Sequence, residues 1–279
     1  MTKTWLITGS SHGFGWELAK AVLDSGDRVV ATARQPEQLD ELVGSYGDRV
    51  RTVALDVTDP AAARAAVQTA IDAFGRLDVV VNNAGYANTA PIEDDPDDDF
   101  RAQIETNLFG VVNVTKAALP VLHAQRSGNF IQFSSIGGRV GGTPGLAAYQ
   151  TAKFGVEGFS EVLNAEVKPL GIKVTIVEPG GFRTDWAGSS MRVLPMSQDY
   201  EQTVGRMVGY RESSSGRQPG DPARAAKIIV DIAGMDDPPL RLLLGADAVE
   251  SADWSSRARA AEAEQWATVS RSADFLPGE

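Results

Sequence analysis

The stretch TWLITGSSHGFG, residues 4–15, decides how the chain begins to fold. Its apolar run from Thr4 to Thr8 predicts a short buried strand, and a glycine-rich turn leads directly into the helical pattern of Trp16 to Leu23. Glycines let a backbone approach a phosphate closely, and the start of a helix presents unpaired N–H groups to negative charge. The segment therefore predicts a dinucleotide-binding turn, although three residues separate its first two glycines and a tight loop without a ligand is the alternative. The candidate contacts are Gly9, Ser11, His12, Gly13, Phe14 and Gly15.

Short β-branched runs alternate with longer alanine-rich segments along the rest of the chain. This alternation is typical of repeated βαβ units that wind a parallel sheet. It predicts an α/β fold of the Rossmann type, a doubly wound parallel sheet of seven strands flanked by helices. The strands are expected near residues 4–8, 28–33, 50–55, 79–81, 129–133, 173–177 and 240–244, with helices over 61–74, 100–119 and 146–167 among others.

Composition narrows the classes of function. The chain has 279 residues, 43% of them hydrophobic, so it can bury a full core, and one domain over residues 1–279 is expected. A net charge of −11 argues against nucleic acid as a partner. With no cysteine and only two histidines, His12 and His123, no metal site is expected, and redox chemistry would need a cofactor. No apolar run approaches the ~20 residues of a membrane-spanning helix, and Met1–Thr8 leaves no room for a leader, so we expect a cytoplasmic protein without membrane contact.

Polar residues follow the next three strands at the edge where a dinucleotide would bind. Arg34 follows the second strand, where NAD-binding proteins normally carry Asp or Glu, and its guanidinium suits a 2′-phosphate, so NADP is favoured over NAD. Asp56 and Val57 follow the third strand, where a carboxylate could hold the adenine amino group, and Asn83-Ala84-Gly85 follows the fourth. A solvated surface arginine and ordinary turn residues are the alternative interpretations.

Tyr149 and Lys153 are four residues apart in an expected helix and therefore share one face of it. Tyrosine, with an ordinary pKa of about 10, is a poor acid–base catalyst near neutral pH unless a positive charge stabilises its phenolate. Lys153 can supply that charge, above all beside a bound oxidised nicotinamide. The hydroxyl of Ser135 could donate to a substrate oxygen as charge develops there. A Tyr-x-x-x-Lys pair alone is mostly structural, so the argument depends on the order of all these parts.

In that order, the residues resemble the short-chain dehydrogenase/reductase family, and Tyr149–Phe154 and Glu178–Asp185 look most like its 17β-hydroxysteroid-dehydrogenase-like members. The resemblance covers roughly residues 4–244. It implies the strand order 3-2-1-4-5-6-7 and a homodimer or homotetramer through the helices that hold Asn107 and Tyr149. The catalytic tetrad it implies is Asn107, Ser135, Tyr149 and Lys153. Near the nicotinamide it implies Pro179, Gly180, Phe182 and Thr184, together with Tyr149 and Lys153.

Two features depart from the family pattern. Ser135 lies fourteen positions before Tyr149, one more than is usual, so Ser134 is an alternative; Ser135 is preferred because Gly137-Gly138 follows it. Phe14 stands where the family often has Ile, and His12 occupies a position that varies with the cofactor. Neither departure alters the backbone contacts that the turn would provide.

The strand pattern lapses over residues 185–220, where one short helix near 196–208 and a substrate loop are expected. Trp186, Met191 and Met196 could line the substrate pocket or form a small core within this loop. The acidic run 93–99 is interpreted as a helix start rather than a cation site, and residues 247–269 as a C-terminal helix.

Together these features predict an NADP(H)-dependent oxidoreductase that interconverts a ketone or aldehyde, as a small-molecule substrate, and the corresponding alcohol. The alternative is an NADP-binding sensor or scaffold protein without turnover.

Overall fold

A seven-stranded parallel sheet forms the centre of the protein in the computed structural model, which describes residues 2–184, 186 and 191–275. Neighbouring strands follow the order β3-β2-β1-β4-β6-β7-β9, and every pair is parallel. This is the predicted strand order, so the Rossmann-type fold is confirmed. The strands are β1 (Thr4–Ile7), β2 (Arg28–Ala33), β3 (Val50–Ala54), β4 (Val79–Asn82), β6 (Gly128–Phe133), β7 (Ile172–Pro179) and β9 (Arg241–Leu244).

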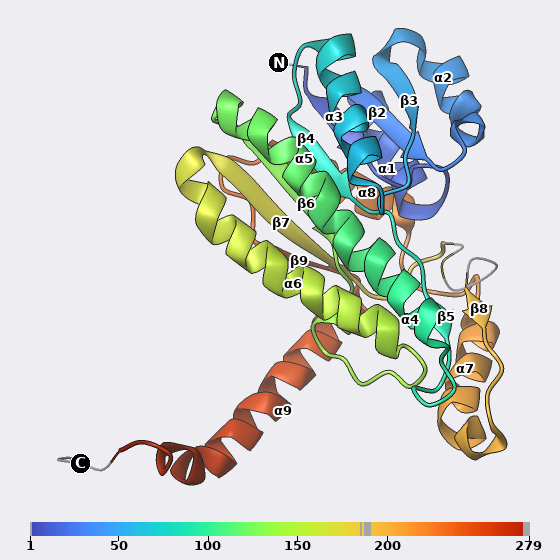
Figure 1. The fold of residues 1–279 in the computed structure, drawn as a ribbon, viewed down its shortest axis with the longest axis vertical. Coiled ribbons are helices and arrows are strands. Elements are labelled where there is room, and N and C mark those ends of the chain that lie inside the picture. The colour runs from blue at the N-terminus through green and yellow to red at the C-terminus, as the bar shows by residue number, and fades with distance from the viewer. Residues whose placement is uncertain (1, 185, 187–190, 276–279) are drawn as a thin grey trace.

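Helices cover both faces of this sheet (Figure 1). The helices are α1 (Gly13–Asp24), α2 (Asp40–Tyr46), α3 (Pro60–Phe74), α4 (Asp97–Ile104), α5 (Gly110–Gln125), α6 (Ala147–Val167), α7 (Arg206–Ser214), α8 (Pro222–Gly234) and α9 (Ala246–Arg271). Alternate side chains of a strand point to opposite faces, so Trp5 and Ile7 join the core under α1 and α8, whereas Leu6 joins the core under α3, α5 and α6. Both faces are therefore apolar, as a buried parallel sheet requires.

Local signals explain where several helices begin and end. Asp59 accepts a hydrogen bond from the N–H of Ala61 at the start of α3, Pro60 occupies the first turn, and Gly75 ends the helix with a left-handed backbone. The acidic run also falls at a helix start, because three of its aspartates occupy the first turn of α4. The predicted helix over 100–119 is longer in the structure, since α4, a π-helical turn over Glu105–Phe109 and α5 run on continuously.

The segment after β7 is more ordered than its composition predicts. Its first part, residue 185 and residues 187–190, lies outside the described residues. Beyond them, β8 (Arg192–Val193) pairs with β5 (Asn88–Thr89) in a second, two-stranded sheet. The short helix expected near 196–208 is wrong in extent, because helical turns run from Gln198 through α7 to Ser214. The sequence of α7, RMVGYRESS, has no apolar stripe that would have indicated a helix, and none of its residues is buried.

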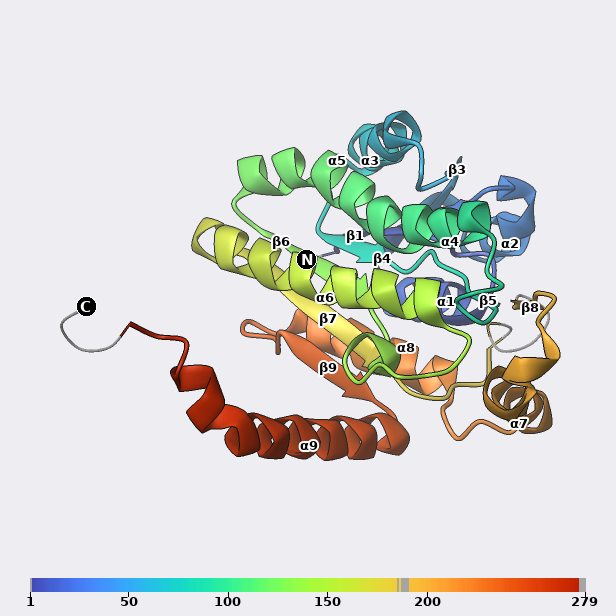
Figure 2. The same cartoon turned by 60° about the horizontal axis from the view of Figure 1, so that its bottom comes forward.

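The C-terminal helix α9 extends away from the sheet in both overall views (Figures 1 and 2). It is longer than the predicted 247–269, and only Ala248, Ala252 and Ser255 in its first half are buried. Within the described part of the chain, none of the helices has the length and apolarity that crossing a membrane requires.

Candidate active site

A cavity of about 1560 Å³ opens along the edge where the parallel strands end. Most small-molecule sites enclose roughly 300–1,000 Å³, so this cavity has room for a dinucleotide together with a substrate. Every predicted site residue except Gly15 lines it, because the loops after β1, β2, β3, β4, β6 and β7 all meet at this edge. Those lining residues are Gly9, Ser11, His12, Gly13, Phe14, Arg34, Asp56, Val57, Asn83, Ala84, Gly85, Asn107, Ser135, Tyr149, Lys153, Pro179, Gly180, Phe182 and Thr184.

The glycine-rich turn after β1 is shaped by close backbone approaches. Gly9 has a φ of +66°, and a Cβ added there would lie 3.0 Å from Cα of Ala84. Gly15 does not line the cavity, and a Cβ on it would lie 2.1 Å from the carbonyl oxygen of Gly9. The amide of Asn83 donates to the carbonyl oxygens of Thr8 (2.9 Å) and Gly9 (3.0 Å), which ties the turn to the end of β4. The turn therefore depends on glycine at two positions for different reasons, backbone conformation at Gly9 and packing at Gly15.

The N-terminus of α1 faces the cavity without a side-chain cap. His12 occupies the N-cap position and makes no capping hydrogen bond, while its Nδ1 lies 3.0 Å from the hydroxyl oxygen of Ser11. The first N–H groups of α1 are thus left to another acceptor, which suits an anion. Phe14 lines the cavity and also packs between Phe133 and Phe182, with ring centroids 5.4 and 4.9 Å away.

Charged and polar groups mark the end of the cavity beside β2 and β3. Arg34 is exposed and lines the cavity, with no acidic residue following it at the end of β2. Asp56 accepts hydrogen bonds from the N–H (2.9 Å) and the hydroxyl (2.7 Å) of Thr58, which fixes its carboxylate in a turn. The carbonyl of Val57 accepts from the side chain of Asn113 at 3.0 Å, so this loop is anchored to α5.

Asn107 lies in the π-helical turn that separates α4 from α5. Its side chain is fully buried, and it donates to the carbonyl oxygens of Tyr86 and Gln103, both at 2.8 Å, while accepting from the N–H of Tyr86 at 3.1 Å. A π-bulge often marks a functional site, because it turns a side chain or a carbonyl out of the regular helix ladder. Through its hydrogen bonds to Tyr86, the Asn107 side chain holds the loop after β4 beside Lys153. Nζ of Lys153 lies 3.7 Å from the position that a Cβ on Gly85 would take.

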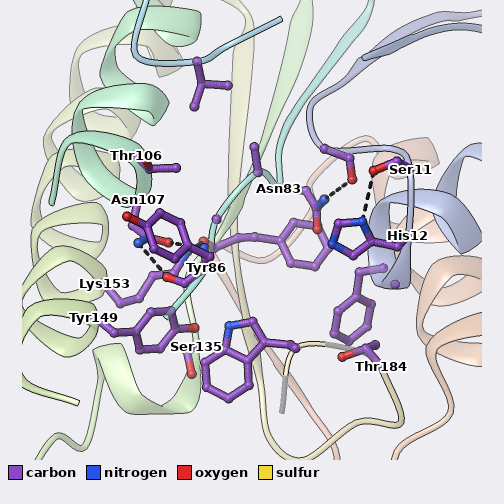
Figure 3. Close-up of a pocket in the computed structure, with 18 of the residues that line it drawn as sticks. Ser11, His12, Asn83, Tyr86, Thr106, Asn107, Ser135, Tyr149, Lys153 and Thr184 are labelled. Atoms are coloured by element: carbon purple, nitrogen blue, oxygen red, sulfur yellow. Dashed lines mark hydrogen bonds between the residues drawn. The ribbon is translucent and has the colours of Figure 1, made fainter. Parts of the chain in front are cut away.

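Tyr149 and Lys153 project from α6 toward the loop that carries Ser135 (Figure 3). Nζ of Lys153 donates to the carbonyl oxygen of Phe133 at 2.7 Å and lies 5.6 Å from the ring centroid of Tyr149. The hydroxyl of Ser135 accepts from the N–H of Gly137 at 3.1 Å, which orients it. Trp186 packs on the ring of Tyr149 with centroids 5.1 Å apart, so an aromatic wall covers the phenol.

Burial dominates the electrostatics of this pair. It raises the pKa of Tyr149 to about 12, and the neighbouring hydroxyl of Ser135 only partly offsets this. It also lowers the pKa of Lys153 to about 8, against the opposing effect of Glu157. In the protein alone, Tyr149 therefore holds its proton throughout the neutral range. That Lys153 stabilises the phenolate beside a bound oxidised nicotinamide stays a prediction.

The two serines at the end of β6 have different surroundings. The hydroxyl of Ser135 lies next to Tyr149, whereas that of Ser134 lies beside Glu157 of α6. A Cβ on Gly138 would come within 2.5 Å of the Ser134 hydroxyl and 2.9 Å of Cβ of Lys153, so Ser134 is confined between that loop and the helix. Ser135 is thus the serine that faces the phenol.

The loop after β7 closes over the glycine-rich turn. The carboxylate of Asp247 accepts from the N–H of Gly181 at 2.6 Å, and a Cβ on Gly180 would lie 2.3 Å from it. Cβ of Thr184 lies 3.5 Å from the Cβ position of Gly13, so this loop reaches the start of α1. Of the three residues expected in the substrate pocket, Trp186 lines the cavity, whereas Met191 and Met196 do not. Met191 and Trp186 both pack against the small buried cluster that contains Tyr149.

Sequence reasoning missed several side chains that line the cavity. They come from loops whose residues carry no motif, and only their position beside Asn83-Ala84-Gly85, beside Asn107 or within the substrate segment could have indicated them. They include Tyr86, Asn88, Thr106, Arg192 and Gln218.

Comparison with known proteins shows which family shares this arrangement. A family model described as short chain dehydrogenase matches residues 3–192. The chain belongs to the short-chain dehydrogenases. It is 54% identical over 271 residues to "Oxidoreductase BOA17" of Botryotinia fuckeliana, which covers 97% of this chain and 98% of that protein. The resemblance to the family is therefore confirmed, and this short-chain dehydrogenase is an oxidoreductase.

Solved structures agree with this assignment. A short-chain dehydrogenase from Streptomyces avermitilis superimposes with a TM-score of 0.91 at 39% identity, covering 99% of this chain and 100% of that one. A short-chain dehydrogenase/reductase from Burkholderia phymatum in complex with NAD gives a TM-score of 0.79 at 18% identity, covering 90% and 92% of the two chains. The second likeness shows that the fold is shared with a protein that holds a nicotinamide dinucleotide.

Proposed function

We propose that this short-chain dehydrogenase interconverts a ketone or aldehyde and the corresponding alcohol with NADP(H), using Asn107, Ser135, Tyr149 and Lys153. The observation that carries the proposal is that the hydroxyl of Ser135 lies next to Tyr149, with Nζ of Lys153 5.6 Å from the Tyr149 ring centroid, in a cavity that the glycine-rich turn also lines. A phenol and a hydroxyl on one side of a large cavity can hold a carbonyl oxygen between them, and the turn suits a pyrophosphate.

The residues present fit a dinucleotide. The cradle after β1 is kept open by Gly9 and Gly13, whose φ values of +66° and +56° suit glycine, and α1 points its uncapped N-terminus into the cavity. At the end of the cavity formed by α6, Lys153 and Tyr149 would lie beside the nicotinamide and its ribose. Asp56 would accept from the adenine amino group at the β3 end.

NADP is proposed over NAD because of Arg34. This guanidinium lines the cavity at the end of β2, the position at which a carboxylate would accept from a free ribose 2′-hydroxyl. A carboxylate there would repel a 2′-phosphate, whereas a guanidinium can pair with it in a fork geometry.

The proton chemistry of the proposed reaction follows from burial. When bound, the reduced nicotinamide supplies the hydride that the carbonyl carbon receives. Because burial keeps the pKa of Tyr149 at about 12, its proton is in place at neutral pH for transfer to the carbonyl oxygen. Ser135 would donate a hydrogen bond to the same oxygen, and Lys153 would stabilise the phenolate that is left. Asn107 would hold the loop after β4 and the π-helical turn in position for a water molecule, and this water would relay a proton back to Tyr149.

The single activity test is NADPH oxidation, followed by absorbance at pH 7, with a panel of ketones, aldehydes and quinones. The proposal predicts turnover with at least one carbonyl class. An NADP sensor or scaffold would bind NADPH tightly and leave the whole panel unreacted, and that result would refute the enzymatic proposal.

We also propose a homo-oligomer that associates through the helices carrying the site. Phe109 and Val162, on the π-turn and on α6, are 45% and 58% exposed, which leaves apolar surface on these helices in the single chain.

A further inference from the structure

Four residues of α6 at intervals of four lie along one face of the helix, and they run from the cavity to the surface. Tyr149 and Lys153 line the cavity, Glu157 is buried one turn further on, and the side chain of Glu161 at the outer end is 52% exposed. The same helix face thus carries the two groups of the proposed chemistry and two carboxylates that this chemistry does not use.

Two arginines and a third carboxylate complete a charged cluster behind the cavity. Nη2 of Arg241, on β9, lies 3.2 Å from Oε2 of Glu157 and also pairs with Glu161, while its Nε lies 3.1 Å from Oε1 of Glu178 on β7. Arg139, in the loop after β6, also pairs with Glu178, with Nη1 3.3 Å from Oε2. The side chain of Glu178 is fully buried and that of Glu157 is 9% exposed, so little water screens them.

The charge of Glu157 is only partly compensated by the arginines. Arg139 and Arg241 both pair with Glu178, whereas Glu157 has Arg241 alone and shares it with Glu161 and Glu178. Neither carboxylate oxygen of Glu157 receives a hydrogen bond from the described residues. The ammonium of Lys153, one helical turn away on the same face, supplies a further positive charge beside it. A buried charge is tolerated only when it is compensated nearby, so the cluster and Lys153 stabilise each other's ionised forms.

We propose that Glu157 is a positioning residue that holds Lys153 in its ammonium form near neutral pH, with Arg241 keeping Glu157 ionised. The inference rests on the proposed function in one respect only, that the ammonium of Lys153 takes part in the reaction.

The titration of both groups agrees with this role. Burial lowers the pKa of Lys153 to about 8, and Glu157 acts in the opposite direction. Burial raises the pKa of Glu157 to about 6, with Glu178 adding to the rise, while the Ser134 hydroxyl and Arg241 oppose it. Between these two values Glu157 is anionic and Lys153 cationic, which covers the neutral range.

The test measures Lys153 directly, without substrate or cofactor. The full-length protein would carry ε-¹³C-lysine, and the Lys153 resonance would be assigned by its loss in Lys153→Met and titrated by NMR. Removing a charge one helical turn away should lower the pKa of Lys153 in Glu157→Gln from about 8 to about 7, a tenfold change in its dissociation constant. Glu161→Gln is the matched control, because it removes a carboxylate from the same face and the same arginine but two turns from Lys153, and its Lys153 should titrate as in the wild type.

Activity supplies a second, separable readout. If the proposed function holds, kcat/KM for carbonyl reduction at pH 8 should fall about fivefold in Glu157→Gln and hardly at all at pH 6, while Glu157→Asp should restore part of the wild-type profile. An unchanged Lys153 titration in Glu157→Gln, or in Glu157→Ala should the first variant not fold, would overturn the inference. A shifted titration in a protein that reduces no carbonyl would support the inference and refute the proposed function.

Discussion

Removing the guanidinium of Arg34 should abolish a preference for NADPH without harming the binding of NADH. Arg34, Lys153 and Arg192 are the arginine and lysine side chains among the described residues that line the cavity, and Arg34 alone lies at the end of β2. A hydrogen bond to a charged group contributes roughly 1.5–3 kcal/mol, and Arg34 is exposed, so about 1–2 kcal/mol is expected after screening. Arg34→Ala should therefore weaken NADPH binding by about 5- to 30-fold.

The assay is the dissociation constant of each reduced cofactor, followed by nicotinamide fluorescence at low and moderate ionic strength. Because a 2′-phosphate adds charge, the wild-type preference for NADPH should also shrink as salt is added. Arg192→Ala is the matched control, since Arg192 is a second exposed arginine of the cavity but pairs with Asp99 at 3.0 Å. Equal losses for NADPH and NADH in Arg34→Ala would show that Arg34 does not bind the 2′-phosphate. An equal loss of selectivity in Arg192→Ala would show that the preference for NADPH is not specific to Arg34.

Two further substitutions test the turn and the serine. Gly15→Ala should destabilise the fold by about 1–3 kcal/mol or more, measured by calorimetry, because its Cβ would lie 2.1 Å from the carbonyl oxygen of Gly9. Gly44→Ala is the control and should not destabilise the fold, because the space around Gly44 is open. Equal melting temperatures of the two variants would contradict the packing argument. Ser135→Ala should lower kcat for carbonyl reduction by about 10²-fold or more, whereas Ser134→Ala should keep most of it, and the reverse order would identify Ser134 as the donor.

The sheet could be predicted from the sequence because its signals are local. The strands are short, largely apolar runs, and most of them are rich in β-branched residues. The Asp59-Pro60 start and the Gly75 end of α3 can likewise be recognised from the local sequence alone. The edge of the sheet then follows from topology, since parallel strands bring all their C-terminal loops together. This is why residues as distant in sequence as Gly9 and Thr184 line one cavity.

The rest depends on contacts that no local pattern reveals. The short pairing of β5 with β8 joins two dipeptides about a hundred residues apart, and α7 lies on the surface without an apolar stripe. The pKa of Tyr149 depends on how deeply the phenol is buried under Trp186 and beside Ala87 and Leu146, and the sequence pattern contained no measure of that. The charge cluster behind Lys153 likewise depends on Arg241, which lies on β9, the last strand of the sheet, and contacts Glu157 of α6 only in the folded protein.

The most direct test of the proposed chemistry is Tyr149→Phe, which removes one hydroxyl and keeps the ring that packs on Trp186. We expect turnover of the best carbonyl substrate to fall by about 10²- to 10⁴-fold, the range of a lost general acid, while the dissociation constant for NADPH changes by less than about twofold. Turnover within a few fold of the wild type would contradict the assignment of Tyr149 as the proton donor.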